Sequence, residues 1–348
     1  MSIIYQEHRN QHYKVVFNQT TGFQIRIEDV GHKEPFWSED GPELLDFSIT
    51  SFCERECPFC YRQADRNGHH ITLKDAERVI SQAKQAGVLQ IALGGGNPNQ
   101  HPQFIKILKM IRSNDIVPSY TTNGVGLTED ILRATKEYCG AMALSIYPPV
   151  QDNTISLIKY ITEKEIKLNL HIILSTLTYE LLISWLKTPP EFLKKINAII
   201  VLNYKPIVKS QDNLILSQSE EEIFYKTVSM SEGLNIGFDS CSVPGIVTYL
   251  TTKKELIEPC EAARFSAFIS EDMKMYPCSF MANTDYYGDL RKSSLVEIWR
   301  NNEYFISYRD FLKHKGCNHC ELRSLCLGGC HFMPQINQCE NVRIRKDI

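Results

Sequence analysis

The chain lacks the long apolar segments and the one-sided charge that mark several classes of protein. No run approaches the roughly 18 apolar residues of a membrane span, and the N-terminus is charged where a signal peptide would be apolar. The 38 basic and 41 acidic residues give a formal net charge of -3 and form no long block of one sign. Nothing therefore indicates binding to nucleic acid or to a membrane, and we expect a cytoplasmic protein.

A disulfide framework is also not expected, although the 348 residues include 12 cysteines. Such frameworks belong mainly to small secreted domains, and this chain is neither small nor visibly exported. Hydrophobic residues make up 43% of the chain, which supports a substantial core without covalent links. The cysteines therefore indicate reduced thiols gathered around metal.

Three segments of different pattern follow one another along the chain. Residues 1–46 contain two alternating runs, Tyr13–Phe17 and Phe23–Ile27, which predict a short β-hairpin. Residues 47–235 alternate short β-rich runs with helical periodicity, which predicts βα units and a parallel sheet. In residues 236–348 this alternation ceases and cysteines become dense, which predicts a small irregular C-terminal domain.

The middle segment is expected to form an α/β fold with a partial (β/α)6 TIM-like barrel. The expected strands number six, fewer than the eight of a closed barrel, and are Leu45–Thr50, Val88–Leu93, Val117–Tyr120, Ala141–Ser145, Leu168–Leu174 and Ala198–Leu202. A capping-box-like start at Thr72 and a stop at Gly87 bound the first helix. The carboxyl ends of the strands should line the active site.

Three cysteines stand directly after the first expected strand. Cys53, Cys57 and Cys60 lie within eight residues of one another. Three thiolates can hold three irons of a 4Fe-4S cluster and leave the fourth iron free to bind a small molecule. A zinc site is the alternative, with His69 or His70 as a further ligand, whereas the C-x2-C-x2-C run of ferredoxins has a different spacing.

With Phe59 before its third cysteine, this loop resembles the radical S-adenosylmethionine (SAM) superfamily, whose hallmark is C-x3-C-x-aromatic-C in the first βα loop. The resemblance covers residues 45–204 and implies a SAM-binding 4Fe-4S cluster and a 5'-deoxyadenosyl radical that abstracts hydrogen from a substrate. It implies cofactor contacts at Phe59, Tyr61, Gly95, Gly96, Asn97, Asn123 and Ser145.

Several of these residues have alternative interpretations. Asn97 stands where the family usually has Glu, so its amide oxygen would accept from the SAM ammonium without a full charge. A phosphate cradle at Gly94–Pro98 lacks the Lys that should follow it, and Asn123 and Ser145 fit ordinary turns equally well. Tyr147 is expected to be a packing residue.

The last part of the chain holds a second group of cysteines. Its core spacing is C-x2-C-x5-C-x3-C, while Cys260 and Cys278 flank an expected hairpin at Arg264–Pro277. The pattern resembles the SPASM extension of radical SAM enzymes, which implies two auxiliary 4Fe-4S clusters. The resemblance assigns one cluster to Cys317, Cys320, Cys326 and Cys339, and the other to Cys260, Cys278 and Cys330.

The second auxiliary cluster lacks a fourth ligand in this assignment. Either Cys241 supplies it or one iron stays open, and we favour Cys241 because ligation by four thiolates is the commoner state. Paired zinc knuckles are the alternative for the region. Met273 stands where relatives usually have Gly, which puts the hairpin's turn geometry in question.

Three 4Fe-4S clusters with SAM predict an enzyme that carries out a net oxidation. SPASM relatives mostly modify ribosomally made peptides, so the resemblance implies a precursor peptide as substrate and a crosslink as the product. It also implies a reductase, flavodoxin or ferredoxin as electron donor, and a separate leader-binding protein as a further candidate partner. The alternatives are a dehydrogenase or modifier of a small metabolite such as an aminosugar, and a non-enzymatic iron-sulfur electron carrier.

Overall fold

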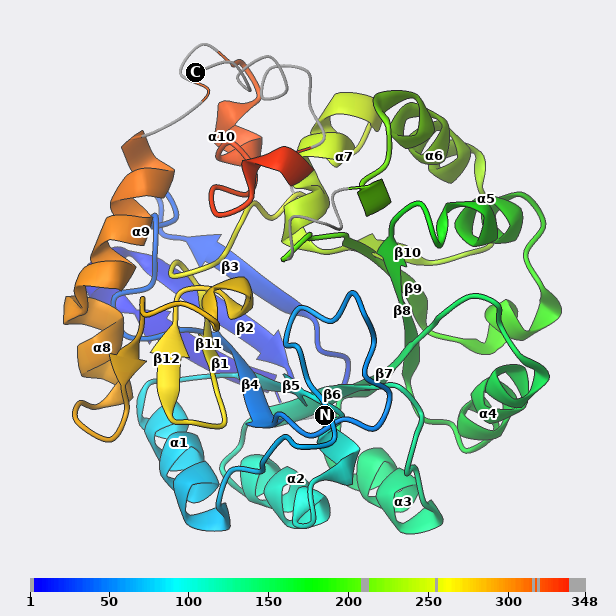
Figure 1. Cartoon of the computed structure of the whole chain (residues 1–348). Coiled ribbons are helices and arrows are strands. Elements are labelled where there is room, and N and C mark those ends of the chain that lie inside the picture. Colours follow the sequence, from blue (N-terminus) through cyan, green and yellow to red (C-terminus); the bar gives the residue numbers. More distant parts are fainter. Residues whose placement is uncertain (1–2, 208–212, 254–255, 315–316, 318–319, 338–348) are drawn as a thin grey trace. The chain divides into compact units, whose positions relative to one another are not determined.

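The computed structural model describes residues 3–207, 213–253, 256–314, 317 and 320–337 as an α/β chain (Figure 1). The chain divides into two compact units, each built from segments that are distant in sequence. The first consists of Met1–Glu56, Arg62–Met142 and Ala262–Arg309, and the second of Cys57–Tyr61, Ala143–Glu261 and Asp310–Ile348. The domain boundaries expected at residues 46 and 235 stay a prediction.

The N-terminal segment forms a three-stranded antiparallel sheet of β1 (Ile3–His8), β2 (Tyr13–Asn18) and β3 (Gln24–Glu28). Pairing of β2 with β3 confirms the expected hairpin, and β1 is an additional strand. Alternate side chains of β2, among them Val15 and Phe17, are buried against Leu89 and Val117. These two residues stand where β5 and β6 begin, so the small sheet covers the amino ends of those strands, away from the ends expected to carry the active site.

The main sheet of the first unit has the strand order β6-β5-β4-β11-β12-β13. Its strands are β4 (Leu44–Thr50), β5 (Gln90–Gly95), β6 (Val117–Thr122), β11 (Ser266–Ile269), β12 (Lys274–Tyr276) and β13 (Gly288–Asp289). β4 pairs in parallel with β5 on one side and with β11 on the other. β11 and β12 pair antiparallel, which confirms the hairpin expected at Arg264–Pro277.

The first unit contains the helix expected between Thr72 and Gly87 together with other helices. They are α1 (Leu73–Gln85), α2 (Phe104–Ser113), α3 (Glu129–Tyr138), α8 (Leu295–Asn301) and α9 (Glu303–His314), the last of which continues into the second unit. The Thr72 side chain accepts from the amide of Asp75 and caps α1, and Gly87 follows its end with a φ of +78°. In Figure 1, α1, α2 and α3 lie in a row.

The second unit continues the alternation of strands and helices. Its elements are β7 (Ala141–Ser145, which begins in the first unit), α4 (Asp152–Glu163), β8 (Leu168–Leu174), α5 (Tyr179–Lys187), β9 (Ala198–Asn203), α6 (Gln218–Met230), β10 (Ile236–Phe238), α7 (Val243–Tyr249) and α10 (Arg323–Cys326). β9 pairs in parallel with both β8 and β10. All six expected strands are therefore confirmed, and β10 adds a parallel strand. In the part of the chain that the structure describes, no helix has the length and apolar character needed to cross a bilayer.

The partly buried imidazole of His171, in β8, makes stability depend on pH. Burial lowers its pKa to about 4, although Asp239 opposes the shift, while an unfolded histidine titrates near 6.5. Unfolding therefore takes up a proton between about pH 6.5 and 4. The free energy of unfolding decreases as the pH is lowered through this range, by up to about 1.4 kcal/mol per pH unit. The substitution His171→Gln should flatten this dependence in urea unfolding at about pH 7 and about pH 5. Equal pH slopes for the two proteins would contradict the prediction.

Candidate active site

The cysteine loop after β4 folds back on its own beginning. Phe52 bridges with Asp65, and the amide of Cys53 donates to the Asp65 carbonyl at 2.8 Å. A Cβ atom on Gly68 would lie 2.2 Å from the carbonyl oxygen of Ser51, so only glycine allows the two stretches of backbone to approach. Cys53 is thereby held in a closed loop at the carboxyl end of β4.

Two glycines at the end of β5 lie close to the backbone that leads into Cys53. Gly95 has a φ of +115°, and a Cβ atom there would lie 2.1 Å from the carbonyl oxygen of Thr50. A Cβ atom on Gly96 would lie 2.0 Å from the carbonyl oxygen of Phe52. Any side chain at either position would force the loops apart, so both glycines are needed for the β5 loop to reach the residues next to Cys53.

Asn97 and Asn123, both expected to contact SAM, are joined to each other and to the first cysteine. Asn97 is 1% exposed, and its Oδ1 accepts from Thr122 Oγ1 at 3.0 Å and from the amide of Asn123 at 3.2 Å. The side-chain amide of Asn123 donates to Cys53 Sγ at 3.4 Å. Asn97 therefore orients a residue that contacts the cysteine thiol, while its own contact with SAM stays a prediction.

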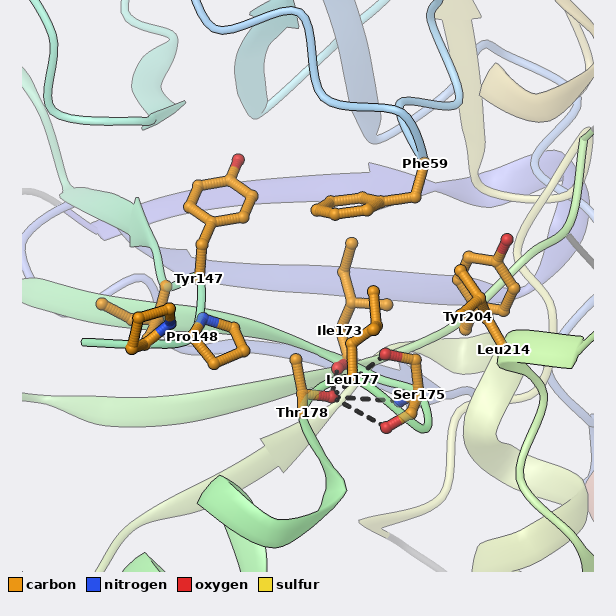
Figure 2. Close-up of a pocket in the computed structure, with 11 residues that line it drawn as sticks. Phe59, Tyr147, Pro148, Ile173, Ser175, Leu177, Thr178, Tyr204 and Leu214 are labelled. Carbon is orange, nitrogen blue, oxygen red and sulfur yellow. Dashed lines mark hydrogen bonds between the residues drawn. The ribbon is translucent and has the colours of Figure 1, made fainter.

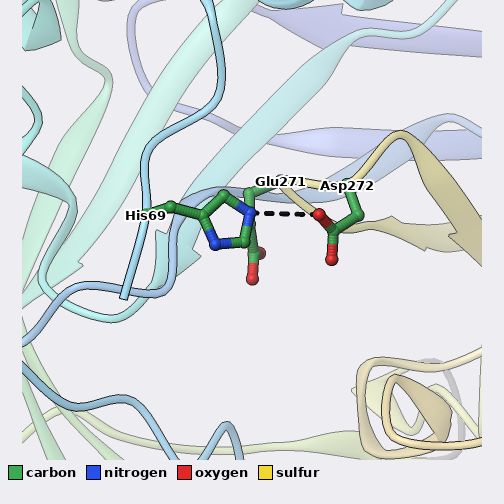
Figure 3. A group of neighbouring side chains, drawn as sticks. All are labelled: His69, Glu271 and Asp272. Carbon is green, nitrogen blue, oxygen red and sulfur yellow. Dashed lines mark hydrogen bonds and ion pairs between the residues drawn. The ribbon is translucent and has the colours of Figure 1, made fainter. Parts of the chain in front are cut away.

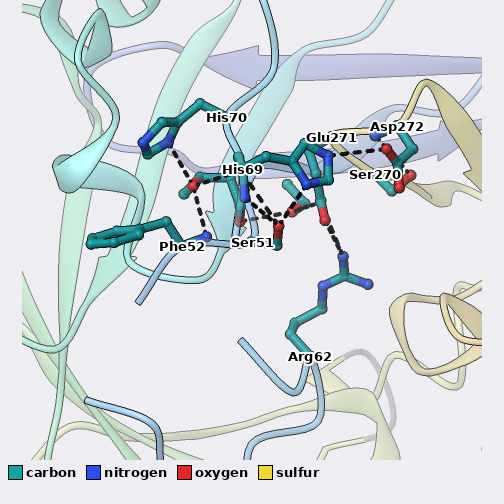
Figure 4. Close-up of polar contacts among 10 residues, drawn as sticks. Ser51, Phe52, Arg62, His69, His70, Ser270, Glu271 and Asp272 are labelled. Atoms are coloured by element: carbon teal, nitrogen blue, oxygen red, sulfur yellow. Dashed lines mark hydrogen bonds and ion pairs between the residues drawn. The ribbon is translucent and has the colours of Figure 1, made fainter. Parts of the chain in front are cut away.

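A buried ion pair stands where the cysteine loop returns to the sheet (Figure 4). Arg62, two residues after the third cysteine, donates from Nη2 to both carboxylate oxygens of Glu271 at 3.1 and 3.0 Å. Ser48 of β4 donates to the same carboxylate, and the guanidinium lies 5.0 Å from the ring centre of Phe268. Because Glu271 belongs to the β11–β12 turn, this cluster ties the end of the loop to two strands. The sequence did not indicate it, since the partners lie 209 residues apart.

Glu271 also lies beside His69 and Asp272, whose ligand atoms are within 4.8 Å of one another and of its own (Figure 3). His69 Nε2 and Asp272 Oδ1 are 3.0 Å apart, and both side chains are exposed. A cation here would compete with Arg62 for the Glu271 carboxylate, so we interpret the group as an ion-pair cluster. His70 bonds to Thr50 Oγ1 at 2.8 Å, so each histidine of the zinc alternative has a protein partner of its own.

The second unit contains a cavity of about 330 Å³ at the carboxyl ends of β7, β8 and β9 (Figure 2). The rings of Phe59 and Tyr147 stack over it with centroids 5.9 Å apart. The hydroxyl of Thr178 donates to the carbonyls of Ile173 and Ser175, so these polar groups have partners within the wall. The lining consists of Phe59, Ile146, Tyr147, Pro148, Pro149, Ile173, Ser175, Leu177, Thr178, Tyr204 and Leu214.

Of the lining residues, only Phe59 was among the predicted contacts. Tyr147 was expected to be a packing residue, and its ring packs against Phe59 in the wall of the cavity. Its position two residues after β7 could have indicated this place, because residues just past the carboxyl ends of parallel strands face the mouth of a barrel. Ser145 ends β7 in the same unit, and Tyr61 follows the turn in which the Cys60 amide donates to the Cys57 carbonyl at 3.0 Å.

Three of the predicted auxiliary ligands in the second unit interact electrostatically with one another. Burial raises the pKa of Cys241, Lys205 lowers it, and the charges of Cys330 and Cys260 raise it further. Cys241 stands in the short turn before α7, far in sequence from both other cysteines. The structure therefore brings the candidate fourth ligand near Cys260 and Cys330.

The remaining auxiliary cysteines are placed as follows. The Cys320 amide donates to the Cys317 carbonyl at 2.9 Å, and Cys326 ends α10. Cys278 belongs to the first unit, after β12, and Cys339 lies outside the described residues. In the hairpin turn, Met273 adopts the left-handed backbone conformation that Gly usually supplies, with a φ of +63°. Its side chain is fully buried. Burial of its side chain offsets the cost of about 1 kcal/mol of that conformation.

Loss of the Glu271 carboxylate should destabilise the protein far more than loss of its neighbour. Glu271→Ala leaves the buried Arg62 guanidinium uncompensated, which costs about 3–5 kcal/mol. Asp272→Ala removes only an exposed pair and should cost less than about 1 kcal/mol. Urea unfolding under anaerobic conditions measures both, and the double substitution Arg62→Met with Glu271→Leu should recover most of the loss. Equal losses for the two alanine variants would contradict this account.

Two family models match parts of the chain. Residues 47–153 match the radical SAM superfamily, and residues 260–321 match the SPASM iron-sulfur cluster-binding domain. The chain is 21% identical over 325 residues to the AdoMet-dependent heme synthase of Methanosarcina barkeri, covering 83% of this chain and 91% of the relative. It is 21% identical over 312 residues to the PqqA peptide cyclase of Bradyrhizobium diazoefficiens, covering 83% and 81%.

Solved structures share the fold over nearly the whole length. SuiB of Streptococcus suis bound to the precursor peptide SuiA has a TM-score of 0.75 and 17% identity, with 94% of both chains covered. SuiB bound to S-adenosylmethionine has a TM-score of 0.72 and 18% identity, also with 94% of both chains covered. The expected α/β fold of the partial-barrel type is thereby confirmed.

These matches agree with the two cysteine groups and with the glycine and asparagine loops beside Cys53. The cofactors of the chain are SAM and iron-sulfur clusters, with a 4Fe-4S cluster in the radical SAM domain. The chain is a radical SAM enzyme that carries a SPASM iron-sulfur cluster-binding domain.

Proposed function

We propose that this enzyme cleaves SAM reductively and oxidatively modifies a ribosomally made precursor peptide, most simply by forming a crosslink. One observation carries the proposal: a three-cysteine loop and a second cysteine group occur in one chain, on the fold of a protein solved with its precursor peptide. A PqqA peptide cyclase among the relatives supports the same class of substrate.

The proposal includes three 4Fe-4S clusters. Cys53, Cys57 and Cys60 would hold the cluster that binds SAM. Of the two auxiliary clusters, one would be held by Cys317, Cys320, Cys326 and Cys339, and the other by Cys241, Cys260, Cys278 and Cys330. The donor set fits, because the thiols of Cys241, Cys260 and Cys330 lie within electrostatic reach of one another and thiolates are the ligands of such clusters.

SAM would bind at the carboxyl ends of the strands. The backbone and side chains of Gly95, Gly96, Asn97, Asn123 and Ser145 would hold its amino-acid part. Phe59, whose ring stacks with that of Tyr147, is a proposed contact of SAM as well. Tyr61, next to the third cysteine, is a further proposed contact. The segmentation into residues 1–46, 47–235 and 236–348 remains part of this proposal.

When bound, the cluster and SAM supply a 5'-deoxyadenosyl radical that takes a hydrogen atom from a substrate carbon. The residues of the chain bind, orient and exclude water. The Asn123 amide donates to Cys53 Sγ, and hydrogen bonds to ligand sulfur tune the potential of a cluster. The Arg62–Glu271 pair holds the end of the cysteine loop in place.

A reductase, flavodoxin or ferredoxin would supply the electron, and a separate leader-binding protein is part of the same proposal. A second candidate function is the modification of a small metabolite, such as dehydrogenation of an aminosugar. It is favoured by one observation, the likeness to a heme synthase over 83% of this chain. A non-enzymatic electron carrier is not proposed, because the family match is to enzymes.

Mass spectrometry of peptides encoded beside the gene distinguishes the two substrate classes. The anaerobic enzyme with SAM and a reductant should release 5'-deoxyadenosine and lower the mass of one such peptide by about 2 Da, the mass of two hydrogens. A variant with Cys53, Cys57 and Cys60 changed to alanine should release none. Cys139→Ala is the matched control, since Cys139 is outside every proposed ligand set. Release of 5'-deoxyadenosine with every peptide mass unchanged would favour the small metabolite.

Iron analysis tests the number of clusters. The reconstituted protein should hold about twelve irons per chain, and the variant lacking Cys53, Cys57 and Cys60 about eight. Cys241→Ala should open a coordination position on one auxiliary cluster and change its electron paramagnetic resonance (EPR) signal, because a thiolate ligand is lost. Cys139→Ala should match the wild type in both measurements. About eight irons in the wild type would reduce the proposal to two clusters.

A further inference from the structure

A buried ammonium group lies just after β9, in the second unit. The side chain of Lys205 is 4% exposed, and its Nζ donates to Asp239 Oδ2 at 2.8 Å and to the carbonyl of Asn203 at 3.0 Å. The other oxygen of Asp239 accepts from Ser242 Oγ at 2.7 Å and from the amide of Asn203 at 3.2 Å. Burying a charge is costly unless it is paired, so this arrangement holds Lys205 in one position.

Hydrogen bonds connect this pair to the auxiliary cysteines. The side-chain amide of Asn203 donates to the carbonyl of Cys241 at 3.1 Å and to that of Ile336 at 3.2 Å. The next residue, Asn337, accepts from the amide of Cys330 at 2.6 Å. Segments near residues 203, 241 and 330 are thus joined around one buried network within the second unit.

The ammonium of Lys205 interacts electrostatically with the thiols of Cys241 and Cys330. Burial alone lowers the pKa of Lys205, but the charges of Asp239, Cys241 and Cys330 raise it above its ordinary value. Asn203, whose carbonyl accepts from Lys205, also donates to the carbonyl of Cys241. A fixed positive charge therefore stands in the hydrogen-bonded network that holds this proposed cluster ligand, where little water screens it.

We infer that Lys205 is a positioning residue that raises the reduction potential of the auxiliary cluster at Cys241, Cys260 and Cys330. This inference rests on the proposed function, since it requires a cluster at these cysteines. A cluster that accepts one electron becomes more negative by one charge, and a nearby ammonium stabilises that form. The carboxylate of Asp239 acts in the opposite sense while holding the ammonium in place.

A purely structural pair and a tuning pair give different results when each partner is neutralised in turn. Lys205→Met should lower the potential, with one-electron reduction about tenfold less favourable, which is about 59 mV. Asp239→Asn keeps the side-chain volume, removes the negative charge, and should raise the potential by a similar factor. A structural role would give no such change of sign.

The experiment is an EPR-monitored redox titration of the full reconstituted chain, with iron content measured for every variant. Lys194→Met and Glu191→Gln are the matched controls, because Lys194 and Glu191 form an exposed pair 2.7 Å apart in the same unit. Both controls should leave the auxiliary potentials unchanged, since water screens exposed charges.

Shifts of opposite sign at Lys205 and Asp239, with wild-type iron content, would support the inference. Unchanged potentials in the two variants would overturn it and leave the three-cluster proposal intact. If the Lys205→Met variant loses iron, the Asp239→Asn variant alone tests the inference. An auxiliary-cluster potential that is unchanged or lower in Asp239→Asn would overturn it. A wild-type protein without any auxiliary EPR signal would instead remove the auxiliary clusters from the proposed function, and the inference with them.

Discussion

The close approach of two backbones at the carboxyl end of β4 is the constraint on which the candidate active site depends. Cβ atoms on Gly95 and Gly96 would collide with the carbonyl oxygens of Thr50 and Phe52, which lie three residues and one residue before Cys53. Only glycine lets the loop after β5 occupy this space. The hydrogen bonds that Asn123 donates, from its backbone amide to Asn97 Oδ1 and from its side-chain amide to Cys53 Sγ, follow from that approach.

Each unit contains one buried ion pair beside a cysteine segment. In the first unit Arg62 pairs with Glu271, and in the second Lys205 pairs with Asp239. Such pairs contribute little net stability, because desolvation costs about as much as the attraction returns. Their effect is to fix the segments that carry them: Arg62 and Ser48 share the Glu271 carboxylate, and Asp239 is held by Lys205, Ser242 and Asn203.

Much of the fold could be predicted from local pattern. The six expected strands and the helix starting after Thr72 were found because hydrophobic periodicity and capping residues act within a few positions. β10 has only three residues, too few to show a period. β11 was expected as part of a hairpin, but its parallel pairing with β4 depends on residues more than 200 positions away. Pairing over such a distance leaves no local signal.

The sequence by itself determined the chemistry of this protein, because cysteine spacing and the aromatic residue before Cys60 are local features that a short loop must present to one metal centre. Tertiary structure decided which distant groups surround those loops. It joined the segments of Cys241 and Cys330 in one hydrogen-bonded network, matched Arg62 with Glu271, and put Tyr147 beside Phe59 in the cavity wall. The physical reason is that burial and the choice of charge partner depend on contacts between segments far apart in the chain, which spacing along the sequence does not encode.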